Sequence, residues 1–149
     1  NKKTNNYQMK KILIINANYY NEITKSLVNA SLKILKKNNY KVSMLTVPGV
    51  LEIPISIKKN INKFDGFIAI GCVIKGKTPH FALICKSSFD AIINLSINHK
   101  KPITNGIITA LTKRQAYERC GKIKSKNPNK GKEAAMALMS IIKNGPKKI

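Results

Sequence analysis

The sequence predicts an α/β fold, a three-layer αβα sandwich in which a central, mainly parallel four-stranded sheet lies between two layers of helices. Short apolar runs alternate along the chain with longer segments whose apolar residues recur at helical spacing, which is the pattern of βαβ units. The 149 residues suffice for one domain with a proper core, and no linker or repeat divides them. We therefore expect a single domain over residues 1–149, with a polar N-terminal segment at 1–10 and a loose tail at 144–149.

The first half of the chain predicts two strand–helix units. The apolar run 11–16 is typical of a buried strand, and a helix is expected over 24–37, where Thr24 opens it and Asn38 ends it. Residues 41–47 predict a second strand, which Pro48 and Gly49 stop. The next helix, over 51–61, must hold Pro54 in its first turn, because proline further inside removes a helical hydrogen bond.

The second half repeats the alternation. A strand is expected over 66–74 and a long helix over 81–98, followed by a strand over 103–109. Two helices, over 113–120 and 131–143, close the chain and are separated by a basic polar segment. Strands that alternate with helices favour a parallel sheet covered on both faces.

The net charge is extreme, with 28 Lys and Arg against 6 Asp and Glu, or +22. Such a charge favours affinity for nucleic acid or anionic substrates. The basic residues are scattered, however, and few aromatic residues are present to stack on bases. Lysine greatly outnumbers arginine, a bias that an AT-rich genome imposes on tolerant surface positions. We expect no specific nucleic-acid binding, only weak association at low salt, and a noncatalytic anion- or nucleic-acid-binding protein remains an alternative.

Membrane and metal sites are not expected. No apolar run approaches the roughly 18 residues of a membrane span, and the polar N-terminus lacks an apolar signal core, so we expect a cytoplasmic protein. The three cysteines are an odd number without a C-x-x-C pair. A disulfide framework or a zinc site is therefore not expected, and each cysteine is interpreted as a small buried hydrophobe.

Four loops are expected to meet where the strands end, at residues 17–20, 47–52, 71–80 and 105–106. Ligands bind at the carboxyl ends of parallel strands. Together the loops offer aromatic rings, the carboxylate of Glu52, backbone amides around glycines, and the group Lys77, Thr78 and His80. This composition predicts a small-molecule pocket with an anion-binding end and, in His80, a general acid or base suited to neutral pH.

Residues 71–78 also satisfy G-x-x-x-x-G-K-[ST], the phosphate-loop pattern of nucleotide hydrolases. We interpret this match as accidental, because Val73 and Ile74 continue the strand where such a loop needs small residues. Neither Asp65, before a strand, nor Asp90, inside a helix, is placed to hold a magnesium nucleotide. A local phosphate site at Lys77 and Thr78 does not require the full loop.

Several motifs stand together in one order and spacing: residues 47–54, 71–81 and 105–109, Glu118-Arg119, and residues 129–131. With this set the chain resembles the lumazine synthase family from about residue 11 to 143. The resemblance implies a flavodoxin-like fold and the condensation of 5-amino-6-(D-ribitylamino)uracil with 3,4-dihydroxy-2-butanone 4-phosphate to 6,7-dimethyl-8-ribityllumazine. Phosphate and water are released in this penultimate step of riboflavin biosynthesis. The resemblance implies no metal and no cofactor.

The resemblance also assigns roles by position. Residues that would hold the ribitylaminouracil are Tyr19, which stacks on the ring, and Val50, Leu51, Glu52, Cys72, Val73, Ile74 and Asn105, the last from a neighbouring subunit. Residues that would hold the butanone phosphate are Lys77, Thr78 and Arg119, whose guanidinium can pair with two phosphate oxygens. His80 would transfer protons, and Lys130 matches a lysine of the family pattern without an assigned role.

Some positions depart from the family pattern. Tyr20 stands where Asn is common, Lys77 where an acidic or small residue is usual, and Asn105 where many members have Phe. Tyr19 replaces Phe and keeps the stacking face, and Lys75 replaces Arg. These departures leave open a third interpretation, in which the fold is kept and the activity is lost.

The resemblance implies homopentamers with active sites between adjacent subunits, an association with riboflavin synthase, and in some members a 60-subunit shell. The connection between Arg119 and Lys130 is a few residues longer than in the short form of the family, which is associated with free pentamers. The high subunit charge opposes close packing of many copies at low salt. We therefore expect a free pentamer.

Overall fold

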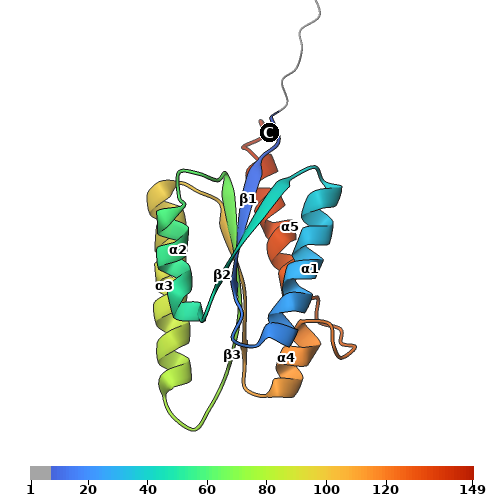
Figure 1. Ribbon diagram of the computed structural model, residues 1–149. Coiled ribbons are helices and arrows are strands. Elements are labelled where there is room, and N and C mark those ends of the chain that lie inside the picture. Colours follow the sequence, from blue (N-terminus) through green and yellow to red (C-terminus); the bar gives the residue numbers. More distant parts are fainter. Residues whose placement is uncertain (1–7) are drawn as a thin grey trace, which may run out of the picture.

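The structure is a computed structural model and describes residues 8–149 (Figure 1). The elements in chain order are β1 (Lys11–Ala17), α1 (Asn21–Lys37), β2 (Lys41–Val47), η1 (Val50–Glu52), α2 (Ile53–Lys59), β3 (Gly66–Ile74), α3 (His80–His99), β4 (Ile103–Ala110), α4 (Lys113–Arg119) and α5 (Lys130–Lys143).

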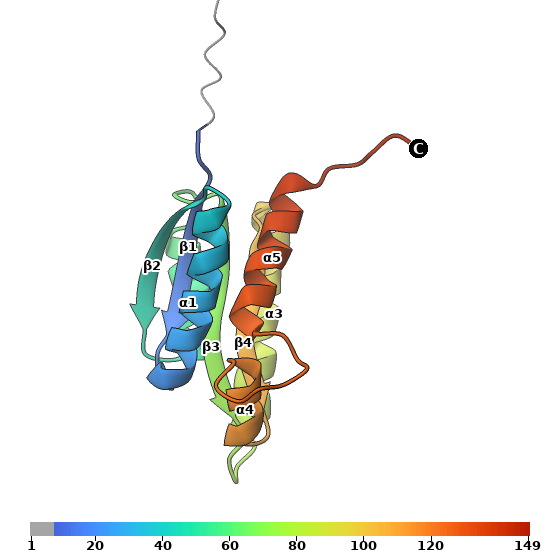
Figure 2. The same ribbon diagram turned by 90° about the vertical axis from the view of Figure 1, so that its right-hand side faces the viewer.

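The four strands form one parallel sheet in the order β2-β1-β3-β4. Helices α2 and α3 cover one face, and α1, α4 and α5 cover the other (Figures 1 and 2). The predicted αβα sandwich is confirmed, and every strand pair is parallel. All strands therefore end at one edge of the sheet, which lies at the bottom of Figure 1 together with the loop that joins β3 to α3.

Two hydrophobic cores fill the space between the sheet and its helical layers. On β1, Ile12 and Ile14 face the core shared with α1 and α5, whereas Leu13 and Ile15 face the core shared with α2. Successive side chains of a strand point to opposite faces. A strand covered on both faces must therefore be apolar at every position, which explains the continuous apolar runs in the sequence.

Helices α1 and α5 approach closely where α5 begins. A side chain at Gly131 would collide with the backbone of Leu27, so only glycine fits this crossing. The buried hydroxyl of Ser31 donates a hydrogen bond of 2.8 Å to the carbonyl oxygen of Gly131. These contacts fix the start of α5, and therefore Lys130, against the rest of the fold.

The predicted strands agree with the structure to within one residue, whereas two helix starts differ. Helix α1 begins at Asn21 instead of Thr24, because the carbonyl oxygen of Tyr20 accepts backbone hydrogen bonds from Ile23 and Thr24 (3.0 Å each). The helix expected over 51–61 divides into the turn η1 and the shorter α2. Pro54 has no N–H to donate, so the α-helical bonding begins with proline in the first turn and a tighter turn precedes it.

Residues 144–149 lie outside helices and strands, and the segment predicted at 1–10 falls largely outside the described residues. Within residues 8–149, no helix combines the length with the apolar character that a membrane crossing requires.

Candidate active site

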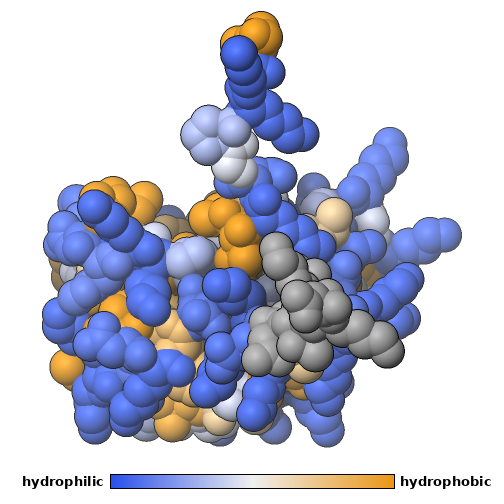
Figure 3. Space-filling model, turned by 90° about the horizontal axis from the view of Figure 1, so that it is seen from above, coloured by the Kyte–Doolittle hydropathy of each residue, from blue (hydrophilic) through white to orange (hydrophobic). Residues whose placement is uncertain are grey.

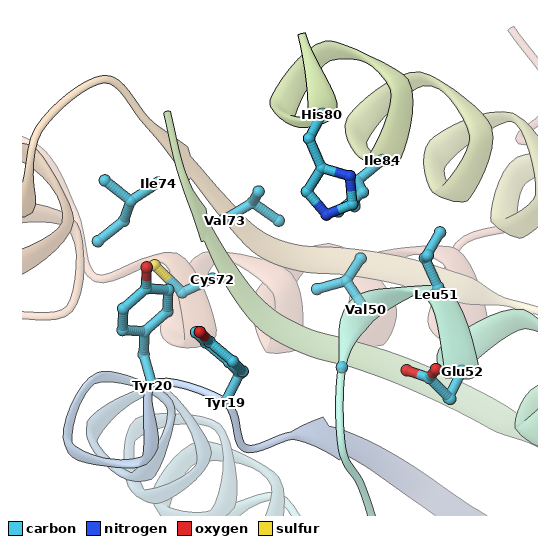
Figure 4. Close-up of a pocket in the computed structure, with 11 residues that line it drawn as sticks. Tyr19, Tyr20, Val50, Leu51, Glu52, Cys72, Val73, Ile74, His80 and Ile84 are labelled. Carbon is cyan, nitrogen blue, oxygen red and sulfur yellow. The ribbon is translucent and has the colours of Figure 1, made fainter. Parts of the chain in front are cut away.

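A hollow of about 350 Å³ opens at the carboxyl ends of β1 and β3 (Figure 4). It is lined by the β1–α1 crossing, the η1 turn, the end of β3 and the first turn of α3. The lining residues are Tyr19, Tyr20, Gly49, Val50, Leu51, Glu52, Cys72, Val73, Ile74, His80 and Ile84. We call this hollow the strand-end pocket.

Glycine at position 71 sets the width of the strand-end pocket. A Cβ atom at Gly71 would lie 2.7 Å from a methyl carbon of Val50 and 3.4 Å from the Cβ of Ala17. Contacts below 3 Å are repulsive, so only glycine lets the η1 turn pack this closely on β3. The close packing buries Val50 and leaves the neighbouring Leu51 and Glu52 exposed at the rim.

The two titratable groups expected from the sequence both line the strand-end pocket. His80 is the first residue of α3, and Figure 4 shows its ring beside Ile84 and turned toward Val50. Glu52 lies on the η1 turn at the opposite side of the pocket. Neither side chain forms a hydrogen bond or an ion pair with another described residue, so both are available to a ligand.

Two tyrosines form the side of the strand-end pocket that faces β1. The ring of Tyr19 is 76% exposed and meets the ring of Tyr20 edge to face, with centroids 5.0 Å apart and planes at 80°. Burial is the main reason that the pKa of Tyr20 is raised, and the neighbouring Tyr19 and Cys72 add to the effect. The pocket therefore presents one exposed aromatic face for stacking and one half-buried neutral hydroxyl.

Cys72 acts as a packing residue at the base of the strand-end pocket. Burial raises the pKa of its thiol to about 12. The thiolate is the nucleophilic form, so a thiol with this pKa is inert near neutral pH. Within residues 8–149, no group of three or more His, Cys, Asp or Glu side chains is arranged to hold a metal ion.

Lys77 and Thr78 lie outside the lining of the strand-end pocket. Both are exposed on the loop between β3 and α3, which extends beyond the rest of the molecule at the bottom of Figure 1. The loop is held at its start, where the backbone N–H of Lys75 donates to the carbonyl oxygen of Ala110 (2.9 Å).

A second hollow, also about 350 Å³, lies along the edge strand β4 and shares no lining residue with the first. Its lining residues are Phe89, Asn105, Ile107, Ile108, Thr109, Arg119 and Lys130. We call it the β4-edge hollow. Three residues that the sequence assigned to one site, Asn105, Arg119 and Lys130, therefore stand apart from the other predicted residues.

The cations of the β4-edge hollow are oriented by fixed partners. The guanidinium of Arg119 donates to the carbonyl oxygen of Pro128 (2.8 Å) and to the Glu133 carboxylate (3.1 Å). The Lys130 ammonium lies 3.9 Å from the same carboxylate. Two of the five guanidinium N–H groups are thus engaged, and the rest remain for an anion.

Comparison with known proteins decides the family. The profile of the 6,7-dimethyl-8-ribityllumazine synthase family matches residues 9–144. The chain belongs to this family. It is 37% identical over 135 residues to a 6,7-dimethyl-8-ribityllumazine synthase of Bartonella bacilliformis, with 88% of this chain and 87% of the relative covered.

Other relatives in the 6,7-dimethyl-8-ribityllumazine synthase family are equally well covered. A Campylobacter jejuni synthase is 38% identical over 137 residues, with 89% of this chain and 87% of the relative covered. A Rhodopseudomonas palustris protein named 6,7-dimethyl-8-ribityllumazine synthase 1 is 36% identical over 140 residues, with 89% of this chain and 84% of the relative covered. Family membership confirms the predicted enzyme class and the predicted reaction of riboflavin biosynthesis.

The structure brings together eight of the family-assigned residues and adds others that the sequence did not assign. Tyr19, Val50, Leu51, Glu52, Cys72, Val73, Ile74 and His80 all line the strand-end pocket. Tyr20 and Ile84 line it as well, and each carried a signal: Tyr20 follows Tyr19 at the same crossing, and Ile84 lies one helical turn after His80. Phe89 and Glu133, which belong to the surroundings of Arg119, carried no such signal.

Proposed function

We propose that the chain forms 6,7-dimethyl-8-ribityllumazine at a site shared by two copies. The strand-end pocket of one copy holds the ribitylaminouracil, and the β4-edge hollow of the next copy faces it and supplies Arg119 for the butanone phosphate. The observation that carries this proposal is the division of the family-assigned residues between two hollows without a common lining residue.

The chemistry of the strand-end pocket suits the first substrate. The exposed ring of Tyr19 stacks on the pyrimidine, and backbone groups of residues 72–74 hydrogen-bond its polar edge. The Glu52 carboxylate lies where a polyol or an amine can donate to it. Mostly apolar walls with a few placed polar groups are typical of small-molecule sites.

The reaction itself needs positioning and proton transfer. The 5-amino group attacks the ketone and water leaves to form an imine; phosphate is then lost, and ring closure follows with loss of the second water. His80 accepts and donates protons in these steps, since an imidazole can serve as a general acid and as a general base. Holding two substrates in one orientation supplies a large part of the rate.

The phosphate subsite combines charges from two surfaces. Lys77 and Thr78 reach it from the exposed β3–α3 loop, and Arg119 pairs with phosphate oxygens from the neighbouring copy. Arg119 is held beside Glu133, so phosphate binding replaces or shares an ion pair that already fixes the guanidinium. Such pre-organisation lowers the entropy that is lost on binding.

Exposed apolar side chains support an assembly of copies. On α3, Leu83, Ile93 and Ile97 are 65%, 58% and 67% exposed. Clustered apolar side chains on a surface mark contacts between proteins. We expect a free homopentamer in the cytoplasm, with a 60-subunit shell and association with riboflavin synthase as the larger assemblies that the family resemblance implies.

A direct test measures the fluorescence of the lumazine product when purified protein is mixed with both substrates. Arg119→Ala should reduce kcat/KM at least a hundredfold and raise the KM of the butanone phosphate, whereas His80→Ala should cause a milder loss. Arg114→Ala is the matched control, because Arg114 lies on the same helix and lines neither hollow, and its one ion-pair partner among residues 8–149 is Glu118. If folded wild-type protein forms product no faster than the uncatalysed background reaction, the chain keeps the fold without the activity.

A second test asks whether two copies share the site. Tyr19→Ala damages the strand-end pocket and Arg119→Ala damages the β4-edge hollow. Refolding the two variants together should restore activity at about one quarter of the interfaces, where both intact surfaces meet. No recovery in mixed assemblies would place the whole site within one chain and overturn the shared-site proposal.

A further inference from the structure

The end of the molecule opposite the strand-end pocket is crowded with lysines. Here the strands begin and the long helices end, so lysines from both gather on one face. They are Lys10, Lys11, Lys36, Lys37, Lys41, Lys58, Lys59, Lys63, Lys100, Lys101 and Lys143. We call this surface the amino-end face. Figure 3 looks down on it and shows hydrophilic residues over most of its area.

Helix dipoles do not account for so many lysines. Cations near a helix carboxyl terminus are stabilised by a partial charge of about −0.5 per helix. The four helices α1, α2, α3 and α5 that end here supply about −2, and Asp65 adds −1. Against the eleven lysines, these leave an excess of about eight positive charges on the amino-end face.

The described carboxylates neutralise other parts of the surface. Ion pairs within residues 8–149 join Lys86 to Asp90 and join Lys113, Arg114, Arg119 and Lys130 to Glu22, Glu118 and Glu133. No lysine of the amino-end face takes part in any of them. Asp65 itself accepts a backbone hydrogen bond from Lys11 (2.7 Å). The positive charge of the molecule is therefore least compensated at this end.

A polar groove runs into the amino-end face. It encloses about 220 Å³, and four of its nine lining residues are lysines: Lys10, Lys11, Lys63 and Lys101. The Lys101 ammonium donates to the carbonyl oxygen of Phe64 (2.8 Å), which holds one cation in place at the wall of the groove. The four lysines outnumber the one carboxylate in this lining, that of Asp65. A concave surface with an excess of one sign of charge focuses the electrostatic field and concentrates counterions.

We propose that the amino-end face binds the phosphate backbone of nucleic acid without sequence preference. This activity is separate from lumazine formation and gives a role to the eleven lysines of the amino-end face, none of which is assigned to the reaction. Lysine ammonium groups bind phosphates as point charges and carry no base information. A nucleic acid fits better than a membrane surface, because a chain of phosphates can enter a groove. Among residues 8–149, the one aromatic ring that lines this groove is Phe64, which is partly buried against Phe67.

The test is fluorescence anisotropy of a labelled DNA duplex of about 20 base pairs with the full chain, titrated at salt concentrations from about 30 to about 150 mM. The face variant is Lys10→Glu, Lys59→Glu, Lys63→Glu. The control variant is Lys124→Glu, Lys126→Glu, Lys132→Glu, at exposed positions near the other end. Each replacement changes the charge by −2, so three replacements take both variants from +22 to +16.

We expect wild type to bind with an affinity that falls steeply with salt, by a log–log slope of about −4. The face variant should bind at least tenfold more weakly at about 50 mM salt, and its slope should be smaller in magnitude by about 2 to 3. The control variant should stay within threefold of wild type. Circular dichroism checks folding, and Lys→Gln at the same three face positions repeats the test without new carboxylates.

Three results would overturn the proposal. One is an equal loss of DNA affinity in the face variant and the control variant, which would mean that total charge and not this face governs binding. Another is the absence of wild-type binding at about 50 mM salt. The third comes from vesicles that contain phosphatidylserine: if the face variant loses binding to the vesicles but not to DNA, the face is a membrane surface.

Discussion

Replacing Gly71 by alanine tests how the strand-end pocket is built. The new Cβ would lie 2.7 Å from a methyl carbon of Val50. Ordinary contact begins at 3.4 Å, so Val50 must retreat by about 0.7 Å. Val50 is buried and Ala17 stands 3.4 Å from the same Cβ, which leaves the methyl group little room to yield.

The expected cost follows from overpacking. Extra methyl groups in a well-packed core destabilise proteins by about 1–3 kcal/mol. If the unfolding free energy falls by about 2 kcal/mol, the melting temperature of a chain of this size should fall by about 4–8 °C. Because the η1 turn carries Leu51 and Glu52, the same shift should raise the KM of the ribitylaminouracil. Urea unfolding and thermal melting measure the first effect, and product fluorescence measures the second.

Two further variants show whether the effect of Gly71→Ala comes from its contact with Val50. Gly76→Ala is the control for stability, because a Cβ added there would meet nothing within 4 Å on the exposed loop, and the backbone at this position needs no positive φ. The double variant Gly71→Ala, Val50→Ala should lose at least about 1 kcal/mol less unfolding free energy than the two single variants lose in sum. The reasoning is refuted if Gly71→Ala is as stable as Gly76→Ala, or if the double variant shows no coupling.

The remaining predictions concern single side chains. Tyr20→Phe should raise the KM of the ribitylaminouracil about fivefold with kcat unchanged, the effect of one lost hydrogen bond; an unchanged KM would show that the hydroxyl does not meet the substrate. Ser31→Ala should lower the unfolding free energy by about 1 kcal/mol, since it removes the buried hydrogen bond that the Ser31 hydroxyl donates to the Gly131 carbonyl oxygen; urea titration measures this loss, and a neutral result would contradict it. Cys72 binds its proton more tightly when folded, so its contribution to stability is complete below about pH 9 and is lost as pH rises toward 12. Urea unfolding of wild type and Cys72→Ala at about pH 8 and about pH 10 measures this effect. Between these two pH values the unfolding free energy of wild type should fall by about 1 kcal/mol more than that of Cys72→Ala, which is less than full burial would give because the residue lines the pocket. An equal fall in the two proteins would contradict the prediction.

The sequence predicted the strands better than the helix starts, for a physical reason. Residues 66–74 were expected as a strand and form β3, because a strand buried on both faces shows as an uninterrupted apolar run. The start of α1 was missed because Tyr20 caps it through its backbone carbonyl, and no side-chain cap marks the sequence. Capping motifs are visible in a sequence only where a side chain accepts the bond.

The candidate site was predictable where chain neighbours supply it. Val50 and Glu52, or Cys72 and Ile74, lie on short segments whose positions follow from the strand ends. The separation of Arg119 from His80 could not be read in this way, because it depends on how α4 and α5 pack beside β4. The crowding of lysines at one end was also invisible, since in the sequence they are scattered, and only antiparallel packing of helices on strands collects them.

The amino-end face gives each subunit an excess of positive charge where the strands begin. Copies arranged in a ring around an axis parallel to the strands would all present this face on the same side of the ring, so their positive charges would add. Two such rings would repel each other if their positive ends met, over a range set by the Debye length of about 8 Å at physiological salt. Ionic strength should therefore decide whether rings of this chain stack through that end or remain separate.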